Sequence, residues 1–299
     1  MTPDPGRLVQ TRACLRGLAV GDALGSQFFV PENRQALSDR SLPPGPWQWT
    51  DDTEMACSVV AVLAGHGAVD QDALARAFAD RHDFDRGYGP AVNRMLRLVR
   101  EGGDWRELAA GLFDGQGSWG NGAAMRVAPL GAWFAGQPET AAQQAERSAT
   151  VTHTHDEAVA GAVAVAVAAA LVAGAPGLPD PLVVLSEVLE LVPRGAVHEG
   201  TRRARDMLDH DDPREVAAVL GCGRHTSAQD TVPFTLWAAA RHLGDFEGAF
   251  WATAEAGGDV DTTCAIVGGI VAAGTGGEPP ADWTGLTESL PDWVPAPSG

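Results

Sequence analysis

The chain of 299 residues carries 39 acidic and 21 basic residues, a formal net charge of −18, and every basic residue is arginine. This negative balance argues against a broad nucleic-acid-binding surface, although a single flipped or terminal nucleotide could still bind locally. The lack of lysine excludes a lysine Schiff base and a P-loop lysine.

Cysteine usage and hydropathy indicate the compartment. The four cysteines are isolated, with no Cys-x-x-Cys pair, and three of them lie in apolar helical patterns typical of core thiols in a reduced compartment. The start of the chain has no apolar signal region, and no stretch of about 20 residues is expected to cross a membrane. We therefore expect a cytoplasmic monomer that has no membrane partner.

Helical periodicity dominates the chain from its first residues. One helix is predicted over about 6–24, and residues 27–49, with four prolines and no sustained period, are predicted to form a long ordered loop. Further helices are predicted over about 73–81, 90–101, 105–113, 122–135, 139–150, 156–174, 180–192, 196–209, 213–221, 230–242 and 245–256. High alanine content and short connections indicate a compact all-α bundle. We expect a single domain over 1–299, with a core of about 7–275 and an irregular tail of about 276–299.

Two stretches place paired carboxylates directly before apolar runs of small residues. They are Thr50-Asp51-Asp52-Thr53 and Asp259-Val260-Asp261-Thr262. An ordinary helix cap explains one carboxylate in each stretch well and two poorly. If both helix starts converge, four Asp carboxylates and two Thr hydroxyls face one point, without His or Cys. Such an all-oxygen set suits Mg²⁺ or Mn²⁺, and four carboxylates favour two bridged ions. The predicted ligands are Thr50, Asp51, Asp52, Asp259, Asp261 and Thr262.

Three predicted loops contain more residues able to bind a ligand than a simple connection between helices requires. The stretch 85–90 could cradle a phosphate at a helix start or be an ordinary turn. The stretch 115–126 combines glycines with Ser118, Trp119 and Asn121, which offer hydrogen bonds and a stacking face to a ligand. In the stretch 152–156, His153 and His155 could bind a metal, but a helix cap and a hydrogen-bond donor are the favoured roles.

These motifs, in this order, resemble those of the ADP-ribosylglycohydrolase family. They are Gly-Asp-Ala-Leu-Gly at 21–25, Thr-Asp-Asp-Thr at 50–53, Arg-Gly-Tyr-Gly at 86–89, Gly-Asn-Gly-Ala-Ala-Met-Arg at 120–126, Thr-His-Thr-His at 152–155 and Gly-Gly-Asp-Val-Asp-Thr-Thr at 257–263. The resemblance implies an orthogonal all-α fold and a two-metal centre built by the six predicted ligands.

The resemblance also implies a reaction and a substrate path. The reaction is hydrolysis of the bond from the distal ribose of ADP-ribose to an acceptor, with Asp51 and Asp261 nearest the attacking water. The partner is therefore an ADP-ribosylated protein, nucleobase or small molecule. The implied substrate-binding residues are Gly87, Tyr88, Gly89, Phe113, Gly117, Ser118, Trp119, Asn121, Gly122 and His153.

One position departs from the family pattern. Relatives commonly carry a glutamate four residues after Gly25, whereas this chain has Phe29, and the nearest glutamate is Glu32. The general base then comes from the Asp cluster or from Glu32, or the protein binds ADP-ribose without efficient turnover. Two-metal phosphoester hydrolysis is a third possibility.

Overall fold

The computed structural model describes residues 5–296, and this part of the chain contains 17 α-helices and no strand. The predicted all-α fold is therefore confirmed. The α-helices are α1 (Pro5–Ser26), α2 (Arg34–Ser38), α3 (Asp51–His66), α4 (Gln71–Arg81), α5 (Pro90–Arg100), α6 (Trp105–Ala110), α7 (Leu112–Gly115), α8 (Ala128–Trp133), α9 (Pro138–Thr150), α10 (Asp156–Gly174), α11 (Pro181–Leu191), α12 (Ala196–Asp206), α13 (Pro213–Leu220), α14 (Ala228–Arg241), α15 (Phe246–Ala256), α16 (Val260–Ala272) and α17 (Ala281–Leu286). Short 3₁₀ turns are η1 (Gln27–Phe29), η2 (Pro31–Asn33), η3 (Phe84–Arg86) and η4 (Asn121–Ala123).

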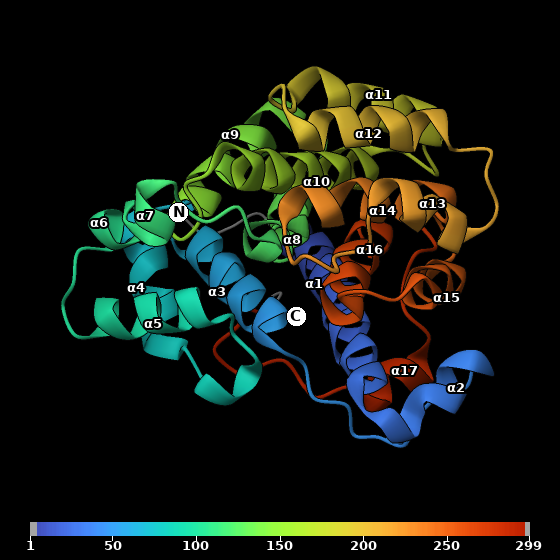
Figure 1. The fold of residues 1–299 in the computed structure, drawn as a ribbon, viewed down its shortest axis with the longest axis horizontal. Coiled ribbons are helices and arrows are strands. Elements are labelled where there is room, and N and C mark those ends of the chain that lie inside the picture. Colours follow the sequence, from blue (N-terminus) through green and yellow to red (C-terminus); the bar gives the residue numbers. More distant parts are fainter. Residues whose placement is uncertain (1–4, 297–299) are drawn as a thin grey trace.

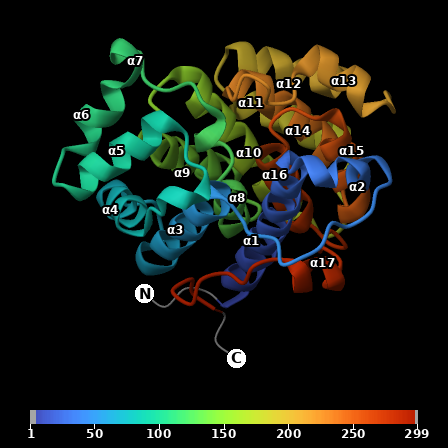
Figure 2. The same cartoon turned by 60° about the horizontal axis from the view of Figure 1, so that its bottom comes forward.

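Helices α1 and α16 pack side by side along their length at the centre of the molecule (Figures 1 and 2). Gly21 and Gly25 of α1 permit this close approach. A Cβ at Gly21 would overlap the carbonyl oxygen of Cys264, and one at Gly25 would lie 2.8 Å from that of Val260. The small residues of the Gly-Asp-Ala-Leu-Gly motif therefore bring α1 against the first turns of α16.

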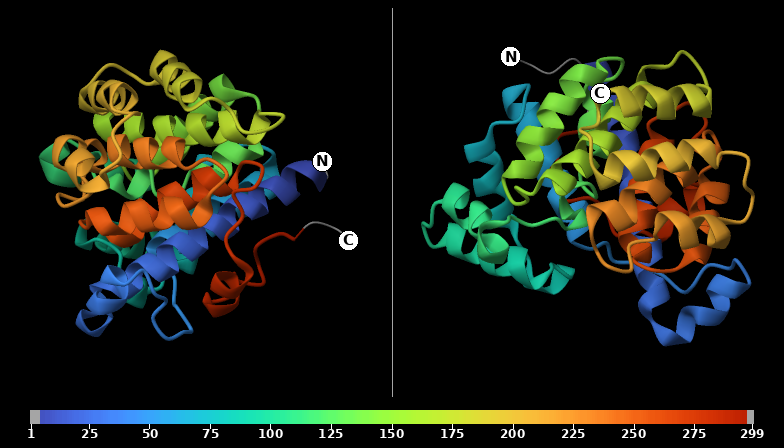
Figure 3. Two further views of the ribbon diagram at one scale, coloured as in Figure 1. Left: turned by 90° about the vertical axis from the view of Figure 1, so that its right-hand side faces the viewer. Right: turned by 45° about the horizontal axis from the view of Figure 1, so that its top comes forward.

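The remaining helices surround this pair. On one side, α10 and α14 form a layer, and α11 and α12 cover it (Figure 3, left). On the other side, α3 packs against α1 and leads into α4, α5, α6 and α7, which lie to the left in Figure 1. The acidic first turn of α3 therefore faces α16 between the two halves of the molecule.

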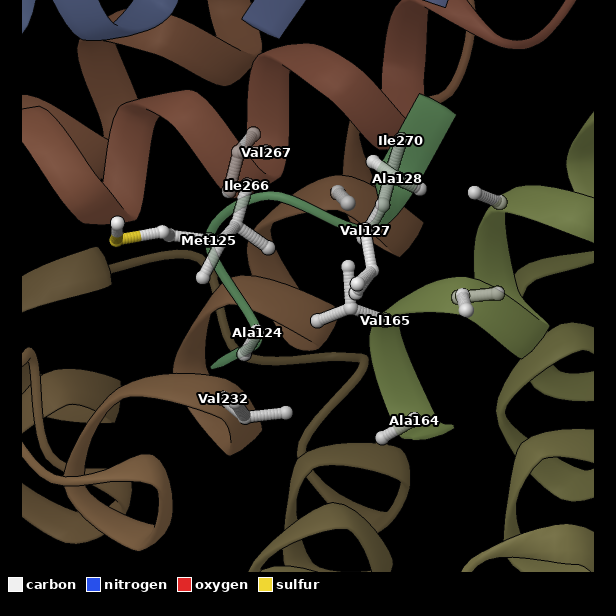
Figure 4. Close-up of a cluster of buried hydrophobic side chains, with 14 of the residues drawn as sticks. Ala124, Met125, Val127, Ala128, Ala164, Val165, Val232, Ile266, Val267 and Ile270 are labelled. Atoms are coloured by element: carbon white, nitrogen blue, oxygen red, sulfur yellow. The ribbon is translucent and has the colours of Figure 1, made fainter. Parts of the chain in front are cut away.

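The core contains many small aliphatic side chains. Val165 of α10, Val232 of α14 and Ile266 of α16 meet the segment 124–128 in one buried cluster (Figure 4). Helix α10 is long and apolar enough to cross a membrane by length and composition, so the expectation that no stretch qualifies is wrong. However, 78% of its apolar window is buried inside the fold, and the small Ala and Val side chains allow helices to pack on all sides of it.

Several local predictions are wrong. Residues 27–49 contain η1, η2 and α2 rather than only loop. The helix predicted over 122–135 is replaced by η4, a turn and α8, and the helix predicted to reach Phe113 ends at Ala110. The tail, expected to be irregular, contains α17. Its Trp283 is buried against Phe246 and Phe250, with ring centroids 6.1 and 5.3 Å away, and this aromatic packing orders the tail.

Candidate active site

The first turns of α3 and α16 meet, as the sequence predicted. Carboxylate oxygens of Asp52, on α3, and Asp261, on α16, lie within 4.8 Å of each other and of an oxygen of Asp22. The Thr262 hydroxyl lies 3.5 Å from Oδ2 of Asp52. Four oxygen-bearing side chains from three helices therefore surround one point.

Asp22 is a central residue of this cluster to which the sequence reasoning gave no role. It is fully buried on α1, and its carboxylate caps the start of α3. Oδ2 accepts hydrogen bonds from the backbone N–H groups of Thr50 and Thr53, at 2.9 and 3.1 Å. The Thr50 hydroxyl donates to Oδ1 at 2.8 Å, and the Thr53 hydroxyl donates to Oδ2. Three of these four bonds reach Oδ2 and one reaches Oδ1, so Asp22 anchors the helix start. The signal available in the sequence was a single acid within the apolar stretch 17–25, the second half of α1.

The clustered carboxylates disfavour one another's ionisation. Burial, followed by the charge of Asp22, raises the pKa of Asp51 to about 8. Burial also raises the pKa of Asp22 to about 6, despite the hydrogen bonds from Thr50 and Thr53. The pKa values of Asp52 and Asp261 are raised by burial and by neighbouring carboxylates. A cation bound among these groups would offset both the cost of burying the charged carboxylates and their mutual repulsion, because it favours the charged forms.

The donor set fits such a cation. Oδ1 of Asp52 is buried and has no hydrogen-bond partner, whereas its Oδ2 lies 3.1 Å from the Thr50 hydroxyl, whose single proton is donated to the nearer Asp22. An unpartnered buried carboxylate oxygen is costly unless a ligand reaches it. The surrounding donors are all carboxylate or hydroxyl oxygens, which are the ligands that Mg²⁺ and Mn²⁺ prefer.

A cavity of about 490 Å³ opens onto the carboxylates. Of the predicted ligands, all except Thr50 line it. Of the predicted substrate-binding residues, all except Tyr88 and Gly117 line it. Gly117 has a positive φ of 74°, and a Cβ there would overlap the Thr154 hydroxyl, so this glycine shapes the loop behind the cavity wall.

Tyr88 supports the wall from behind. Its buried hydroxyl donates a hydrogen bond to Oε2 of Glu54, at 2.6 Å, and the backbone N–H of Asp83 donates to the same oxygen at 3.1 Å. Glu54 lies in the first turn of α3. The contact therefore fixes the backbone of Gly87 and Gly89 beside the carboxylate cluster. The sequence placed Tyr88 on the substrate path, whereas its side chain faces the protein.

Asn121 connects the glycine-rich loop to the carboxylate cluster. Its Nδ2 donates to Oδ2 of Asp259 at 2.7 Å and to the Thr231 hydroxyl at 3.1 Å. These bonds hold the Asp259 carboxylate in one orientation at the start of α16. Asn121 therefore contributes a positioning contact in addition to lining the cavity.

His153 is buried as a neutral imidazole at the cavity wall. Burial, and then the nearby Arg126 cation, lower the pKa of His153 to about 3. One ring nitrogen lies 2.7 Å from the Thr152 hydroxyl. Arg126, which the sequence reasoning left without a role, donates to the Ser148 carbonyl at 2.8 Å and to the Thr152 hydroxyl at 3.0 Å. His153 is therefore suited to hydrogen bonding and not to supplying a proton near neutral pH.

An aromatic pair forms the far end of the cavity. The ring centroids of Phe113 and Trp119 lie 4.8 Å apart. The ring of His155 packs edge-on against Trp119, with a centroid distance of 5.8 Å. Phe113 has a left-handed backbone, with φ 52° and ψ 52°. Such a conformation costs a non-glycine residue about 1–3 kcal/mol, and backbone strain of this kind is common at functional sites. His155 also caps α10, accepting from the N–H of Glu157 at 3.1 Å, as the favoured prediction had it.

Phe29 and Glu32 lie outside the cavity lining. Phe29 is 53% exposed at the end of η1, and Glu32 is exposed in η2. The acidic side chains that line the cavity are Asp51, Asp52, Asp259 and Asp261. In this conformation, the carboxylates available to the cavity come from the Asp cluster.

Comparison with known proteins agrees with this geometry. A profile of the ADP-ribosylglycohydrolase family matches residues 3–296. The chain belongs to the ADP-ribosylglycohydrolase family. It is 33% identical over 278 residues to an uncharacterized protein of Archaeoglobus fulgidus, covering 88% of this chain and 86% of that one. It is 28% identical over 304 residues to ADP-ribosylarginine hydrolase Tri1 of Pseudomonas putida, covering 95% of this chain and 75% of that one.

Two further matches show how much of the chain aligns with other members of the family. Human ADP-ribosylhydrolase ARH3 is 34% identical over 165 residues, which is 49% of this chain and 45% of that protein, so this alignment spans about half of each. A solved structure titled ADP-ribosylglycohydrolase-related protein complex has a TM-score of 0.66 and 27% identity, and covers 94% of this chain and 93% of that one. The family match includes both acidic helix starts, the glycine-rich loop and α17.

Proposed function

We propose that this ADP-ribosylglycohydrolase family member is a hydrolase that removes ADP-ribose from an acceptor, with the help of two divalent cations. The observation that carries the proposal is the convergence of oxygen ligands from α3 and α16 at one end of a ligand-sized cavity. The names of the relatives ARH3 and Tri1 support the reaction class. The four buried free cysteines support a reducing, cytoplasmic setting.

The residues that would hold the cations are Thr50, Asp51, Asp52, Asp259, Asp261 and Thr262. When bound, Mg²⁺ or Mn²⁺ supplies Lewis acidity and neutralises the carboxylate cluster. Asp22 keeps the first turn of α3 in place by capping the Thr50 and Thr53 amides. Asn121 fixes the Asp259 carboxylate.

The lining residues would place the distal ribose at the carboxylates and the adenosine at the aromatic end. Asp51 and Asp261 would orient the attacking water and accept its proton, and their negative charge would stabilise an oxocarbenium-like transition state. Backbone amides near Gly87 and Gly89 would hold the diphosphate. The neutral ring of His153 would hydrogen-bond to the substrate without competing for the proton.

A second candidate function is ADP-ribose binding without turnover. The observation that favours it is the absence of any glutamate among the cavity-lining residues, together with Phe29 at the position where relatives carry one. A carboxylate from the Asp cluster that also holds a cation is a weaker base than a free glutamate. General acid-base assistance is worth about 10²–10⁴-fold in rate, so its loss could leave a binder.

Product analysis tests both functions. The purified protein, with Mg²⁺ or Mn²⁺, is incubated with ADP-ribosylated arginine, serine and nucleobase substrates. Release of free ADP-ribose supports the proposed hydrolase, whereas release of AMP indicates attack on the diphosphate. Asp51→Asn is the inactive control. ADP-ribose binding without product on any acceptor would establish the binding function instead.

A further inference from the structure

The segment that follows α17 lies against the residues that lead into α3. The backbone N–H of Trp47 donates to the carbonyl of Leu286 at 2.7 Å, and the N–H of Glu288 donates to the carbonyl of Trp47 at 2.8 Å. The indole N–H of Trp49 also donates to the carbonyl of Ser289, at 3.4 Å. Figure 1 shows this segment, in red, running from α17 toward α3 and α5. The tail therefore pairs with the chain directly before the first turn of α3, and no role proposed above uses it.

Glu288 in this segment forms a bidentate ion pair with Arg86. Nη1 and Nη2 of Arg86 donate to Oε2 and Oε1 of Glu288, at 2.7 and 2.8 Å. Nη1 also donates to the carbonyl of Trp49 at 2.9 Å, and the guanidinium carbon lies 3.5 Å from the centroid of the Trp49 ring. Nε of Arg86 lies 3.7 Å from Oδ2 of Asp83, a longer contact within the same loop. Because only 18% of the Arg86 side chain and 30% of the Glu288 side chain are exposed, this stacked, bidentate pair fixes its two partners better than a solvated pair would.

Arg86 directly precedes a stretch of loop that lines the cavity. Gly87 and Gly89 both belong to the cavity lining. A Cβ on Gly87 would lie 3.8 Å from Oδ1 of Asp51, so the loop backbone passes beside the carboxylate cluster. Gly87 has a positive φ of 92°, and glycine is the most conformationally free residue. The position of this backbone therefore depends on the contacts that its neighbours make.

Two carboxylates from distant parts of the chain make those contacts. On the inner side, Glu54 of α3 accepts from the Tyr88 hydroxyl and from the backbone N–H of Asp83, at 2.6 and 3.1 Å. On the outer side, Glu288 holds Arg86, which lies between these two residues in the sequence. The loop is thus tied to α3 at both of its ends and to the tail in its middle.

We propose that Glu288 is a positioning residue for the candidate active site. Through Arg86, it holds the backbone of Gly87 and Gly89 where the loop can bind the diphosphate of ADP-ribose. The inference rests on the proposed function for the identity of this ligand. Neither Glu288 nor Arg86 lines the cavity, so their effect on a ligand passes through the loop.

Isothermal titration calorimetry of the full chain with ADP-ribose, at saturating Mg²⁺, tests the inference. Glu288→Ala is expected to weaken ADP-ribose binding by about tenfold, a typical coupling between groups that share a network. Glu288→Gln keeps one acceptor for Arg86 and is expected to lose less. The matched control is Glu199→Ala, because Glu199 forms a similar bidentate pair with Arg202, at 3.0 and 2.7 Å, outside the cavity lining. This control is expected to leave binding unchanged.

Two further measurements separate positioning from general destabilisation. The Mg²⁺-induced thermal shift of Glu288→Ala should equal that of the wild type, because Asp22 caps the start of α3 independently of the tail. Hydrogen exchange of the segment 83–89, without ADP-ribose, should become about threefold or more faster in Glu288→Ala, because the amides of Asp83 and Arg86 are hydrogen-bonded within the held loop. Glu199→Ala should leave this exchange unchanged.

Each result decides one point. ADP-ribose affinity or loop exchange that is the same in Glu288→Ala and the wild type overturns the positioning role. Weaker binding together with loss of the Mg²⁺-induced shift also overturns it, because the whole site is then disturbed. If the wild type fails to bind ADP-ribose, the proposed function is refuted. In that case hydrogen exchange still decides whether Glu288 holds the loop.

Discussion

Replacement of Asp22 by two neutral residues measures how strongly this buried carboxylate anchors α3. Asp22→Asn keeps one side-chain oxygen, whereas Asp22→Ala keeps none. The backbone N–H groups of Thr50 and Thr53 both reach the same oxygen, Oδ2, at 2.9 and 3.1 Å. An Asn carbonyl can occupy that position, with its amide facing the Thr50 hydroxyl, 2.8 Å from Oδ1. The Ala variant leaves both N–H groups without this acceptor, one on the buried Thr53 and one on the partly buried Thr50.

The expected difference follows from these contacts. A stranded buried N–H costs about 1–3 kcal/mol, so the free energy of unfolding of Asp22→Ala should be about 2–6 kcal/mol below that of Asp22→Asn. Both variants lack the charge, and the burial cost of the carboxylate therefore cancels in this comparison. Threonine hydroxyls can rotate toward other acceptors, so they are left out of the sum.

Urea denaturation followed by circular dichroism, near neutral pH, provides the measurement. Asp104 provides the matched control, because it caps α6 at an exposed site by accepting from the N–H of Arg106 at 2.8 Å. Asp104→Ala should be only about 0.5–2 kcal/mol less stable than Asp104→Asn. Equal differences at the two sites would refute the anchoring role of Asp22. Loss of the Mg²⁺-induced stabilisation in Asp22→Asn would make Asp22 a metal ligand.

Three further predictions concern the carboxylates and the cap of α10. Because burial raises the pKa of Asp22 and Asp51 above the unfolded value near 3.8, the unfolded chain releases protons first as pH rises. The melting temperature of the metal-free protein should therefore decrease as the pH rises from about 4 to about 8, and Mg²⁺ should stabilise the protein more at the higher pH. A melting temperature that increases over this pH range contradicts the buried cluster. Asp51→Asn and Asp261→Asn should each abolish product release and reduce the Mg²⁺-induced thermal shift, whereas His155→Ala should lose only a helix cap, about 1 kcal/mol in urea unfolding, with activity retained. Glu32→Gln should leave kcat nearly unchanged at saturating metal, since this exposed side chain does not line the cavity, and a tenfold or greater loss would assign it the role of general base.

The chain sequence determines the local parts of this protein. The helix start at Asp51 follows from the Thr50 cap ahead of an apolar run, and the start at Val260 follows from the Gly-Gly turn ahead of another. The oxygen chemistry of the proposed metal centre follows from Asp and Thr without His or Cys. Both signals depend on residues that are neighbours in the chain. The cap at His155 belongs to the same class of local feature.

Only the tertiary structure decides which side chains serve the cavity and which serve the scaffold. Asp22 precedes Thr50 by 28 residues, and nothing in its own helix predicts that it caps another. Tyr88 faces Glu54 rather than the cavity, because a turn position does not fix the direction of a side chain. Helix α17 forms where Trp283 finds aromatic partners about 30 residues away. In each case the free energy comes from contacts between distant segments, and these contacts exist only when α1, α3, α15 and α16 are packed together.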